Sequence, residues 1–151
     1  MKTASGFRTF TRASVLVFIA IVINGCAMRA SHQGIPPEVE AVVTTVGDDA
    51  NEGRYEKIHN EAAEEWRNDA TLDKTIRVLS AVKDKLGRVK SRELHSASEE
   101  TRSSGAVPGR SFVLTYDTKF ERGDGMETFT IVEKNGRWML ARYFVNSLAL
   151  Q

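Results

Sequence analysis

The sequence predicts an α+β domain in which N-terminal helices pack on a curved antiparallel sheet of about four strands. Apolar residues recur at helical spacing between residues 37 and 86, and they alternate with polar residues between residues 111 and 147. Asn135-Gly136 separates the last two alternating segments. Both residues of such a pair tolerate the positive φ of a type I′ turn, so an antiparallel hairpin is expected there.

The first predicted helix has Pro37 in its first turn, where the missing N–H is tolerated. Four valines at positions i, i+3, i+4 and i+7 form one apolar side: Val39, Val42, Val43 and Val46. The pattern predicts that this helix ends before Gly47 and that residues 47–53 bend the chain.

Two more helices are expected before the sheet. One runs from about residue 52 to residue 68, with Tyr55, His59 and Trp66 on or beside its apolar side. The other follows a Thr71 N-cap and ends at Gly87. Its apolar side consists of Leu72, Ile76, Leu79, Val82 and Leu86.

The first strand is predicted over residues 88–98, and the polar segment 99–109 is expected to be a loop. The next strand alternates cleanly, so Tyr116 and Asp117 should point to opposite faces. The last strand has apolar residues on both sides. Trp138, Leu140 and Phe144 are expected on one face, and Met139, Ala141, Tyr143 and Val145 on the other. Because apolar residues on both faces need to be covered, we expect either a sheet that curls over itself or a homodimer through the sheet.

The N-terminus has the order of a secretory signal. Three basic residues, Lys2, Arg8 and Arg12, precede an 11-residue segment, 13–23, that is apolar except for Ser14. This is shorter than the roughly 20 residues of a membrane-spanning helix. Residues 23–26, Ile-Asn-Gly-Cys, resemble the lipobox of bacterial lipoproteins, which implies a lipid on Cys26.

This resemblance predicts three segments: a signal peptide over residues 1–25, a tether over 26–36 and one domain over 37–151. Cys26 is the only cysteine, so no intramolecular disulfide forms, and acylation explains a lone thiol in an exported protein. The alternative is a secreted soluble protein in which Cys26 has no role. Ala27 is not the aspartate of an inner-membrane retention signal, which favours the outer membrane, facing the periplasm.

Several short motifs resemble an uncharacterised family of small exported bacterial domains with the nuclear-transport-factor-two-like, or cystatin-like, cone. They are Gly53-Arg54-Tyr55, the segment 86–92 (LGRVKSR), Pro108-Gly109, the segment 116–120 (YDTKF), Glu127-Thr128, Gly136-Arg137-Trp138 and Arg142-Tyr143-Phe144. The resemblance implies a cone-like fold and an exported location. It implies no reaction, because the family has no established activity.

The candidate pocket residues are those that a space between helices and sheet would gather: Tyr55, His59, Trp66, Tyr116 and Tyr143. His59 is either a histidine at the edge of the core or a base, and His95 is expected at the surface. Arg92 and Glu127 are expected to pair across the sheet, either as a structural ion pair or as a cation that is presented to an anionic ligand.

Two functions follow from these observations. The first is a non-catalytic envelope lipoprotein that binds a small ligand, a peptide or a partner protein through the helix–sheet pocket or a sheet face. The alternative is a small pocket enzyme of isomerase or hydrolase type that uses a histidine or carboxylate base. The sequence has no phosphate-binding loop, dinucleotide fingerprint, metal-spaced His/Cys cluster or nucleophile elbow, so no cofactor is predicted. Beyond residue 25 acidic residues outnumber basic ones by two, which gives no indication of nucleic-acid binding.

Overall fold

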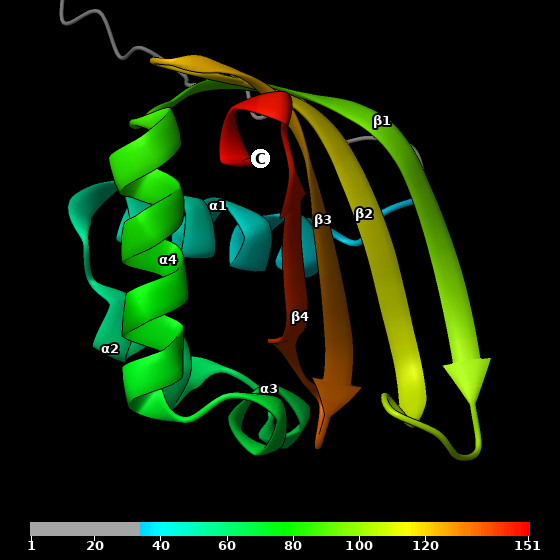
Figure 1. Ribbon diagram of the computed structural model, residues 1–151. Coiled ribbons are helices and arrows are strands. Elements are labelled where there is room, and N and C mark those ends of the chain that lie inside the picture. The colour runs from blue at the N-terminus through cyan, green and yellow to red at the C-terminus, as the bar shows by residue number, and fades with distance from the viewer. Residues whose placement is uncertain (1–33) are drawn as a thin grey trace, which may run out of the picture. The chain divides into compact units, whose positions relative to one another are not determined.

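The computed structural model describes residues 34–151, which form four helices, a four-stranded sheet and a short 3₁₀ helix. The helices are α1 (Pro37–Glu52), α2 (Tyr55–Glu61), α3 (Glu64–Asp69) and α4 (Leu72–Leu86). The strands are β1 (Val89–Arg102), β2 (Gly109–Phe120), β3 (Gly123–Lys134) and β4 (Arg137–Asn146), followed by η1 (Leu148–Leu150). The predicted α+β class, with helices before an antiparallel sheet, is confirmed (Figure 1).

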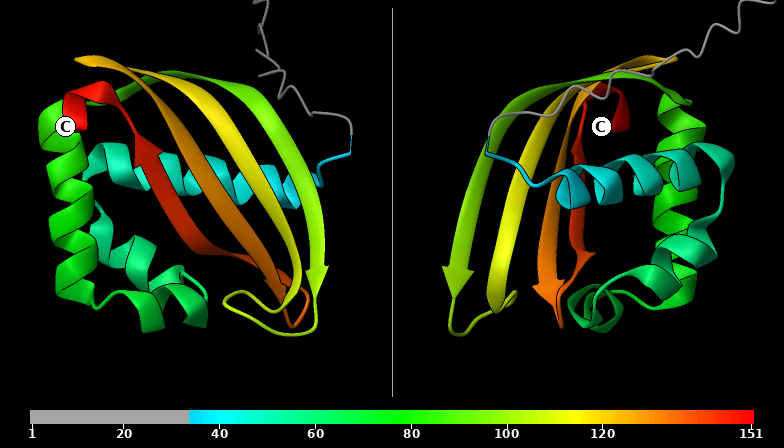
Figure 2. Two further views of the ribbon diagram at one scale, coloured as in Figure 1. Left: turned by 45° about the vertical axis from the view of Figure 1, so that its right-hand side comes forward. Right: turned by 180° about the vertical axis from the view of Figure 1, so that it is seen from behind.

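The strands lie in the order β1-β2-β3-β4, and each is antiparallel to its neighbours. The sheet is curved, and the helices lie on its concave side (Figure 2). Helix α1 crosses the strands, whereas α4 lies beside α1 and α2 on the β4 side of the sheet (Figure 1). One face of the sheet is therefore covered by helices.

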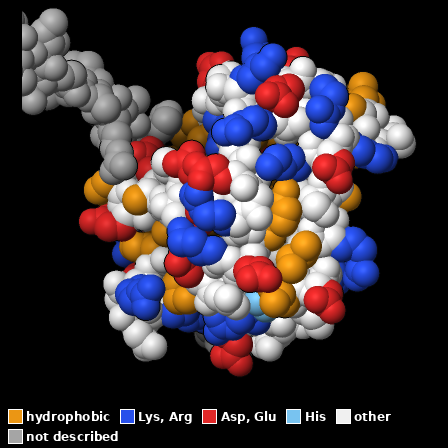
Figure 3. Space-filling model, turned by 90° about the vertical axis from the view of Figure 1, so that its left-hand side faces the viewer, with side chains coloured by type: hydrophobic (Ala, Val, Ile, Leu, Met, Phe, Trp, Pro, Cys, Tyr) orange, Lys and Arg blue, Asp and Glu red, His pale blue; other side chains and the backbone are white. Residues whose placement is uncertain are grey.

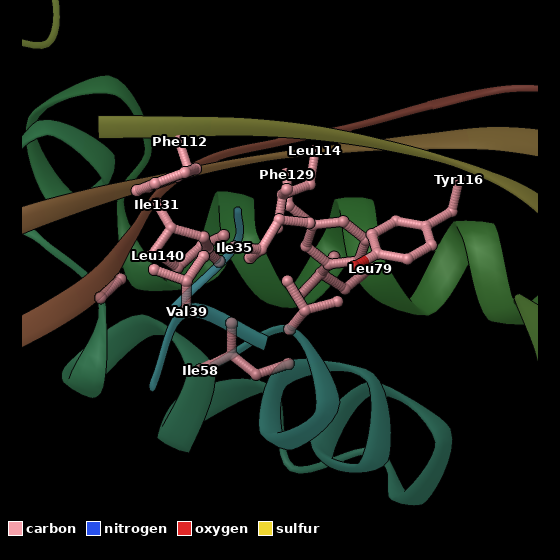
Figure 4. Packing of buried hydrophobic residues seen from close by; sticks show 12 residues of the cluster. Ile35, Val39, Ile58, Leu79, Phe112, Leu114, Tyr116, Phe129, Ile131 and Leu140 are labelled. Carbon is pink, nitrogen blue, oxygen red and sulfur yellow. The ribbon is translucent and has the colours of Figure 1, made fainter. Parts of the chain in front are cut away.

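The main core lies between α1 and the concave face of the sheet (Figure 4). Alternate residues of β2 and β3 point toward the helices, as strand geometry requires. The strands contribute Phe112, Leu114, Tyr116, Phe129, Ile131 and Leu140. The preceding segment and the helices contribute Ile35, Val39, Val43, Ile58 and Leu79.

Helix α1 does not end before Gly47 as predicted. It continues to Glu52, and Gly53 ends it in a left-handed conformation with φ of 78°. Gly47 instead lies inside the helix, where a Cβ atom would clash with the Arg92 guanidinium. The glycine is therefore explained by close packing against β1, and the prediction of a bend over residues 47–53 is wrong.

The predicted helix over residues 52–68 is divided into α2 and α3. Ala62 and Ala63 are buried in extended conformations between them, and the Ala63 N–H donates to the Leu140 carbonyl of β4 at 2.8 Å. Arg67 donates to the Ala62 carbonyl at 2.5 Å. A tertiary hydrogen bond thus breaks the helix at a place where residues 54–69 contain neither glycine nor proline.

Helix α4 has the predicted ends. The Thr71 hydroxyl accepts from the Lys74 N–H at 3.3 Å, and Gly87 is the C-cap with φ of 79°. The Asn135-Gly136 hairpin is also confirmed, since the two residues have φ of 52° and 74°.

Strand β1 is longer than predicted, because residues 99–102 pair with residues 109–112 of β2. The loop is therefore limited to residues 103–108. The polar side chains of this extension lie on an exposed strand end, so the absence of apolar alternation does not prevent pairing.

The predicted faces of β4 are wrong beyond residue 140. The β3–β4 register places Ile131 opposite Leu140 and Thr130 opposite Arg142, so Ala141 is an extra, bulged residue. Tyr143 consequently packs with Leu140 against the main core, and Phe144 is 65% exposed. Met139 and Ala141 belong to a smaller cluster with Ala63, Val107 and Val132.

Candidate functional site

A mainly apolar cavity of about 220 Å³ lies between α1, α2 and the beginning of β4. Its apolar lining consists of Ala41, Val42, Val46, Ile58, Ala62, Trp138, Met139 and Leu140. The charged and polar groups that also line it include Thr45, Asp49, Glu61 and Arg137. We call this cavity the α1–β4 pocket. It exists because Val42 and Val46 are the half-buried members of the valine stripe, whereas Val39 and Val43 fill the core.

Asp49 is the buried acid of the α1–β4 pocket, and two cations hold it. Its Oδ1 lies 2.6 Å from Arg54 Nη2, and its Oδ2 lies 2.8 Å from Lys57 Nζ. Burial raises the pKa of Asp49, but the hydrogen bonds and charges of Lys57 and Arg54 outweigh it, so the pKa is lowered. Near neutral pH the Asp49 carboxylate is thus ionised and bonded to two cations. A carboxylate with a lowered pKa and two such partners is a poor general base.

A second buried polar group, separate from the α1–β4 pocket, is centred on Glu127. Its side chain is 0% exposed, and it accepts two hydrogen bonds from Arg92, at 2.5 Å and 3.0 Å. Thr118 and Tyr143 donate to the same carboxylate at 2.7 Å and 2.6 Å. We call these four residues the Glu127 cluster. The expected pairing of Arg92 with Glu127 is therefore present across the sheet.

Arg92 is also largely buried, with 18% of its side chain exposed, and its guanidinium lies 5.6 Å from the centre of the Phe129 ring. Burial lowers the pKa of Arg92, but the hydrogen bond and charge of Glu127 outweigh this and raise it. A cavity of about 20 Å³ beside Glu127 has room for roughly one water molecule, and Arg92 and Thr118 also line a larger open groove at the end of the sheet. Since the Glu127 carboxylate is fully buried and accepts four hydrogen bonds from the protein, the Glu127 cluster has the geometry of a structural ion pair.

Gly47 provides a test of how tightly this cluster is packed. Alanine would favour the helix by up to about 1 kcal/mol, but its Cβ would displace a guanidinium that Glu127 holds with two bonds. We expect Gly47→Ala to lower the free energy of unfolding by about 1–3 kcal/mol, measured by urea denaturation. Asp48→Ala, at the exposed neighbour, should change it by less than about 0.5 kcal/mol. A more stable Gly47→Ala variant would contradict this packing.

All three tyrosines of the protein have raised pKa values. Burial is the main cause at Tyr143, whose pKa lies well above 10.0, and the Glu127 carboxylate raises it further. Burial is also the main cause at Tyr116 and Tyr55, with added effects from Glu40 and Asp84 respectively.

Because the folded state binds these phenolic protons more tightly, their contribution to stability is complete below pH of about 10 and is lost at higher pH. We expect the near-ultraviolet absorbance of phenolate to appear above pH of about 10 in the folded protein, with a falling free energy of unfolding. The same titration in concentrated urea should be centred near pH of about 10. A folded-state titration with that same centre would contradict the burial of these hydroxyls.

The five candidate pocket residues are dispersed, and none of them lines the α1–β4 pocket. Trp66 Nε1 donates to the buried Thr75 hydroxyl at 3.1 Å, and His59 Nδ1 lies 3.1 Å from the same oxygen. Tyr55 lines a separate open hollow, while Tyr116 packs edge-on against Phe129.

A larger hollow, of about 820 Å³, lies at the end of the sheet beside the C-terminal segment. It is an open groove, and many of its side chains are exposed and polar, among them Glu93, Asp117, Lys119 and Asp124. His95, at the surface as expected, lies 3.0 Å from Asp117. Such a groove does not exclude water from a ligand, so we consider the smaller α1–β4 pocket the better candidate site.

Charges of both signs are interspersed on the side of the molecule that carries α2 and α4 (Figure 3). Within residues 34–151, no group of three or more His, Cys, Asp or Glu side chains could hold a metal ion. None of the helices in this region is long and apolar enough to cross a membrane. Cys26, the predicted signal peptide and most of the predicted tether lie outside the described residues.

Sequence reasoning missed Asp49, Thr118 and the pocket role of Arg137. Asp49 falls in the part of α1 beyond Gly47, where no helix was expected. Thr118 lies two residues after Tyr116 in β2, so both side chains point to the concave side of the sheet. This alternation along the strand could have identified Thr118 from the sequence. Arg137 follows the hairpin turn, and no pattern in the sequence brings it near α1.

The chain belongs to the DUF4019 family, described as proteins of unknown function, since residues 42–143 match the sequence model of that family. The match extends from α1 to Tyr143 in β4 and includes the Glu127 cluster. The expected membership of an uncharacterised domain family is thereby confirmed. A comparison with curated proteins found no match.

Proposed function

We propose that this protein is a non-catalytic lipoprotein of the cell envelope that binds a small apolar ligand in the α1–β4 pocket. The observation that carries the proposal is the pocket's lining, which consists largely of aliphatic side chains and Trp138. Ligand sites are typically concave and mainly apolar, with a few polar groups that fix orientation. The α1–β4 pocket has both kinds of group.

The volume limits the size of the ligand. A cavity of about 150 Å³ is enough for benzene, so about 220 Å³ suits roughly eight or nine carbon atoms. This is below the roughly 300–1,000 Å³ of sites for drug-sized molecules. A short hydrocarbon chain or a single small ring is therefore the class of ligand that we expect.

The ionisable groups near the helices support binding over the alternative of an isomerase or hydrolase. Asp49 is held by two cations, and Glu127 already accepts four hydrogen bonds outside the α1–β4 pocket. His59 is engaged with Thr75 and does not line the pocket. A general base must reach the proton that it removes, and none of these three groups has that freedom.

Binding can be tested with octan-1-ol, a neutral probe of suitable size, by NMR titration of the full-length protein. We expect saturable shifts at methyl groups of Val42 and Leu140. Val46→Phe should fill the pocket and abolish them, whereas the same substitution at Val78, which is 49% exposed on α4, should leave them unchanged. Shifts that are absent, or that persist in a folded Val46→Phe variant, would contradict the proposed site.

The proposed location depends on Cys26 as the lipid attachment site, with the domain on the periplasmic side of the outer membrane. The basic, apolar and small-residue segments before Cys26 support it. We expect the Cys26→Ser variant to leave the membrane fraction, while a Ser31→Ala variant in the tether stays there. Equal membrane association of Cys26→Ser and the wild type would contradict lipid anchoring.

Two finer predictions belong with this function. The curved sheet with helices on its concave side fits the nuclear-transport-factor-two-like, or cystatin-like, architecture that the motifs resemble. A homodimer through the outer sheet face also stays a prediction, with Phe144 as its large exposed apolar side chain. Equilibrium sedimentation giving a monomer well above micromolar concentration would contradict the dimer.

A further inference from the structure

We propose that the ligand of the α1–β4 pocket carries one carboxylate, which Arg137 binds at the rim while a short hydrocarbon chain fills the interior. This inference rests on the function proposed above and adds the chemical class of the ligand. It follows from the distribution of charge around the pocket.

The acidic groups at the pocket already have cationic partners. Asp49 is paired with both Arg54 and Lys57. Lys57 also lies 3.6 Å from Glu61, the other acid of the lining, and Arg54 is paired with Glu52. Both acids of the lining, Asp49 and Glu61, therefore lie beside a cation of the protein.

Arg137 differs from these residues. It is exposed, it lines the pocket, and its side chain makes no hydrogen bond or ion pair with any other residue in 34–151. Its position directly after the Asn135-Gly136 turn fixes the backbone, while the long side chain stays free. Arg137 is thus the uncompensated cation among the lining residues.

A guanidinium forms two parallel hydrogen bonds with a carboxylate, and charge-assisted bonds of this kind are stronger than neutral ones. The pocket places this cation beside Trp138 and close to the aliphatic lining. The same ligand can therefore place its chain among Val42, Val46 and Leu140 and its carboxylate on Arg137. A neutral ligand of equal length would lose the second interaction.

The test compares octanoate with octan-1-ol, which has the same chain length, by calorimetric titration of the full-length protein at neutral pH. We expect octanoate to bind about tenfold more tightly. Arg137→Gln should remove this preference, and Arg137→Lys should keep part of it. Arg88→Gln is the matched control, since it removes the same charge from an exposed arginine that does not line the pocket.

Each other outcome rejects the inference in a recognisable way. Equal affinities for the two probes would reject the carboxylate and leave the proposed apolar site intact. A preference for octanoate that persists in Arg137→Gln, or that disappears equally in Arg88→Gln, would reject Arg137 as its partner. If neither probe binds, the proposed function fails together with this inference.

Discussion

Replacing Glu127 with alanine is expected to lower the free energy of unfolding by about 3–5 kcal/mol. The substitution removes the acceptor of four hydrogen bonds and leaves the mostly buried Arg92 guanidinium without its counter-ion. The buried hydroxyl of Thr118 also loses its acceptor. An unpaired buried charge costs far more than the net gain from a paired one, so the effect should be large.

Urea denaturation of single and double variants measures how much of the stability loss comes from the interaction between Arg92 and Glu127. Arg92→Met should also be strongly destabilising, but the double variant Arg92→Met/Glu127→Leu should lose less than the two single losses together, because no orphan charge remains. Glu100→Ala breaks an exposed pair with Arg102 and should cost no more than about 1 kcal/mol. Additive losses, or a Glu127→Ala effect as small as this control, would contradict a structural ion pair.

Phe129→Ala should have an effect of similar size, about 3–5 kcal/mol, because it removes a fully buried ring from the centre of the core. Phe129 contacts Tyr116 and Tyr143, with ring centres 5.9 Å and 5.0 Å away, and lies beneath the Arg92 guanidinium. The void would therefore loosen both the core and the Glu127 cluster.

The matched control for this substitution is Phe144→Ala on the same sheet. Phe144 is 65% exposed, so its removal should change the free energy of unfolding by less than about 0.5 kcal/mol. Urea denaturation of both variants gives the comparison. Similar losses at the two positions would mean that the faces of β3 and β4 are not as described.

The elements that the sequence predicts correctly are those with local signals. The Asn135-Gly136 turn, the Thr71 N-cap and the Gly87 stop depend on the conformations that these residues themselves prefer. Such preferences act over a few residues and can be recognised without knowing what packs nearby.

The predictions that fail depend on contacts between distant segments. Gly47 looks like a helix stop, but it is retained inside α1 because Arg92 occupies the space of its Cβ. Ala62 and Ala63 favour helix, yet the bond from Ala63 to Leu140 breaks it. The bulge at Ala141 exchanges the two faces of β4 for the residues that follow it. The alternation of apolar and polar residues in the sequence does not show where such an extra residue is inserted.

The candidate site shows the same division. Arg92 and Glu127 pair across β2, because they lie on the same face of the two strands that flank it, and strand parity also separates Tyr116 from Asp117. The α1–β4 pocket instead depends on where α1 crosses the sheet and on the break before α3. Those positions are set by tertiary packing, so the sequence indicated a space between helices and sheet but not its lining.

The most direct test of the account is a crystal structure of the full-length protein under xenon pressure, because xenon occupies accessible apolar cavities and polar hollows hold water instead. We expect a xenon atom in the α1–β4 pocket, in contact with Val46 and Trp138, and none in the open groove beside the C-terminal segment. An α1–β4 pocket filled by ordered water, with no xenon, would contradict its assignment as an apolar ligand site.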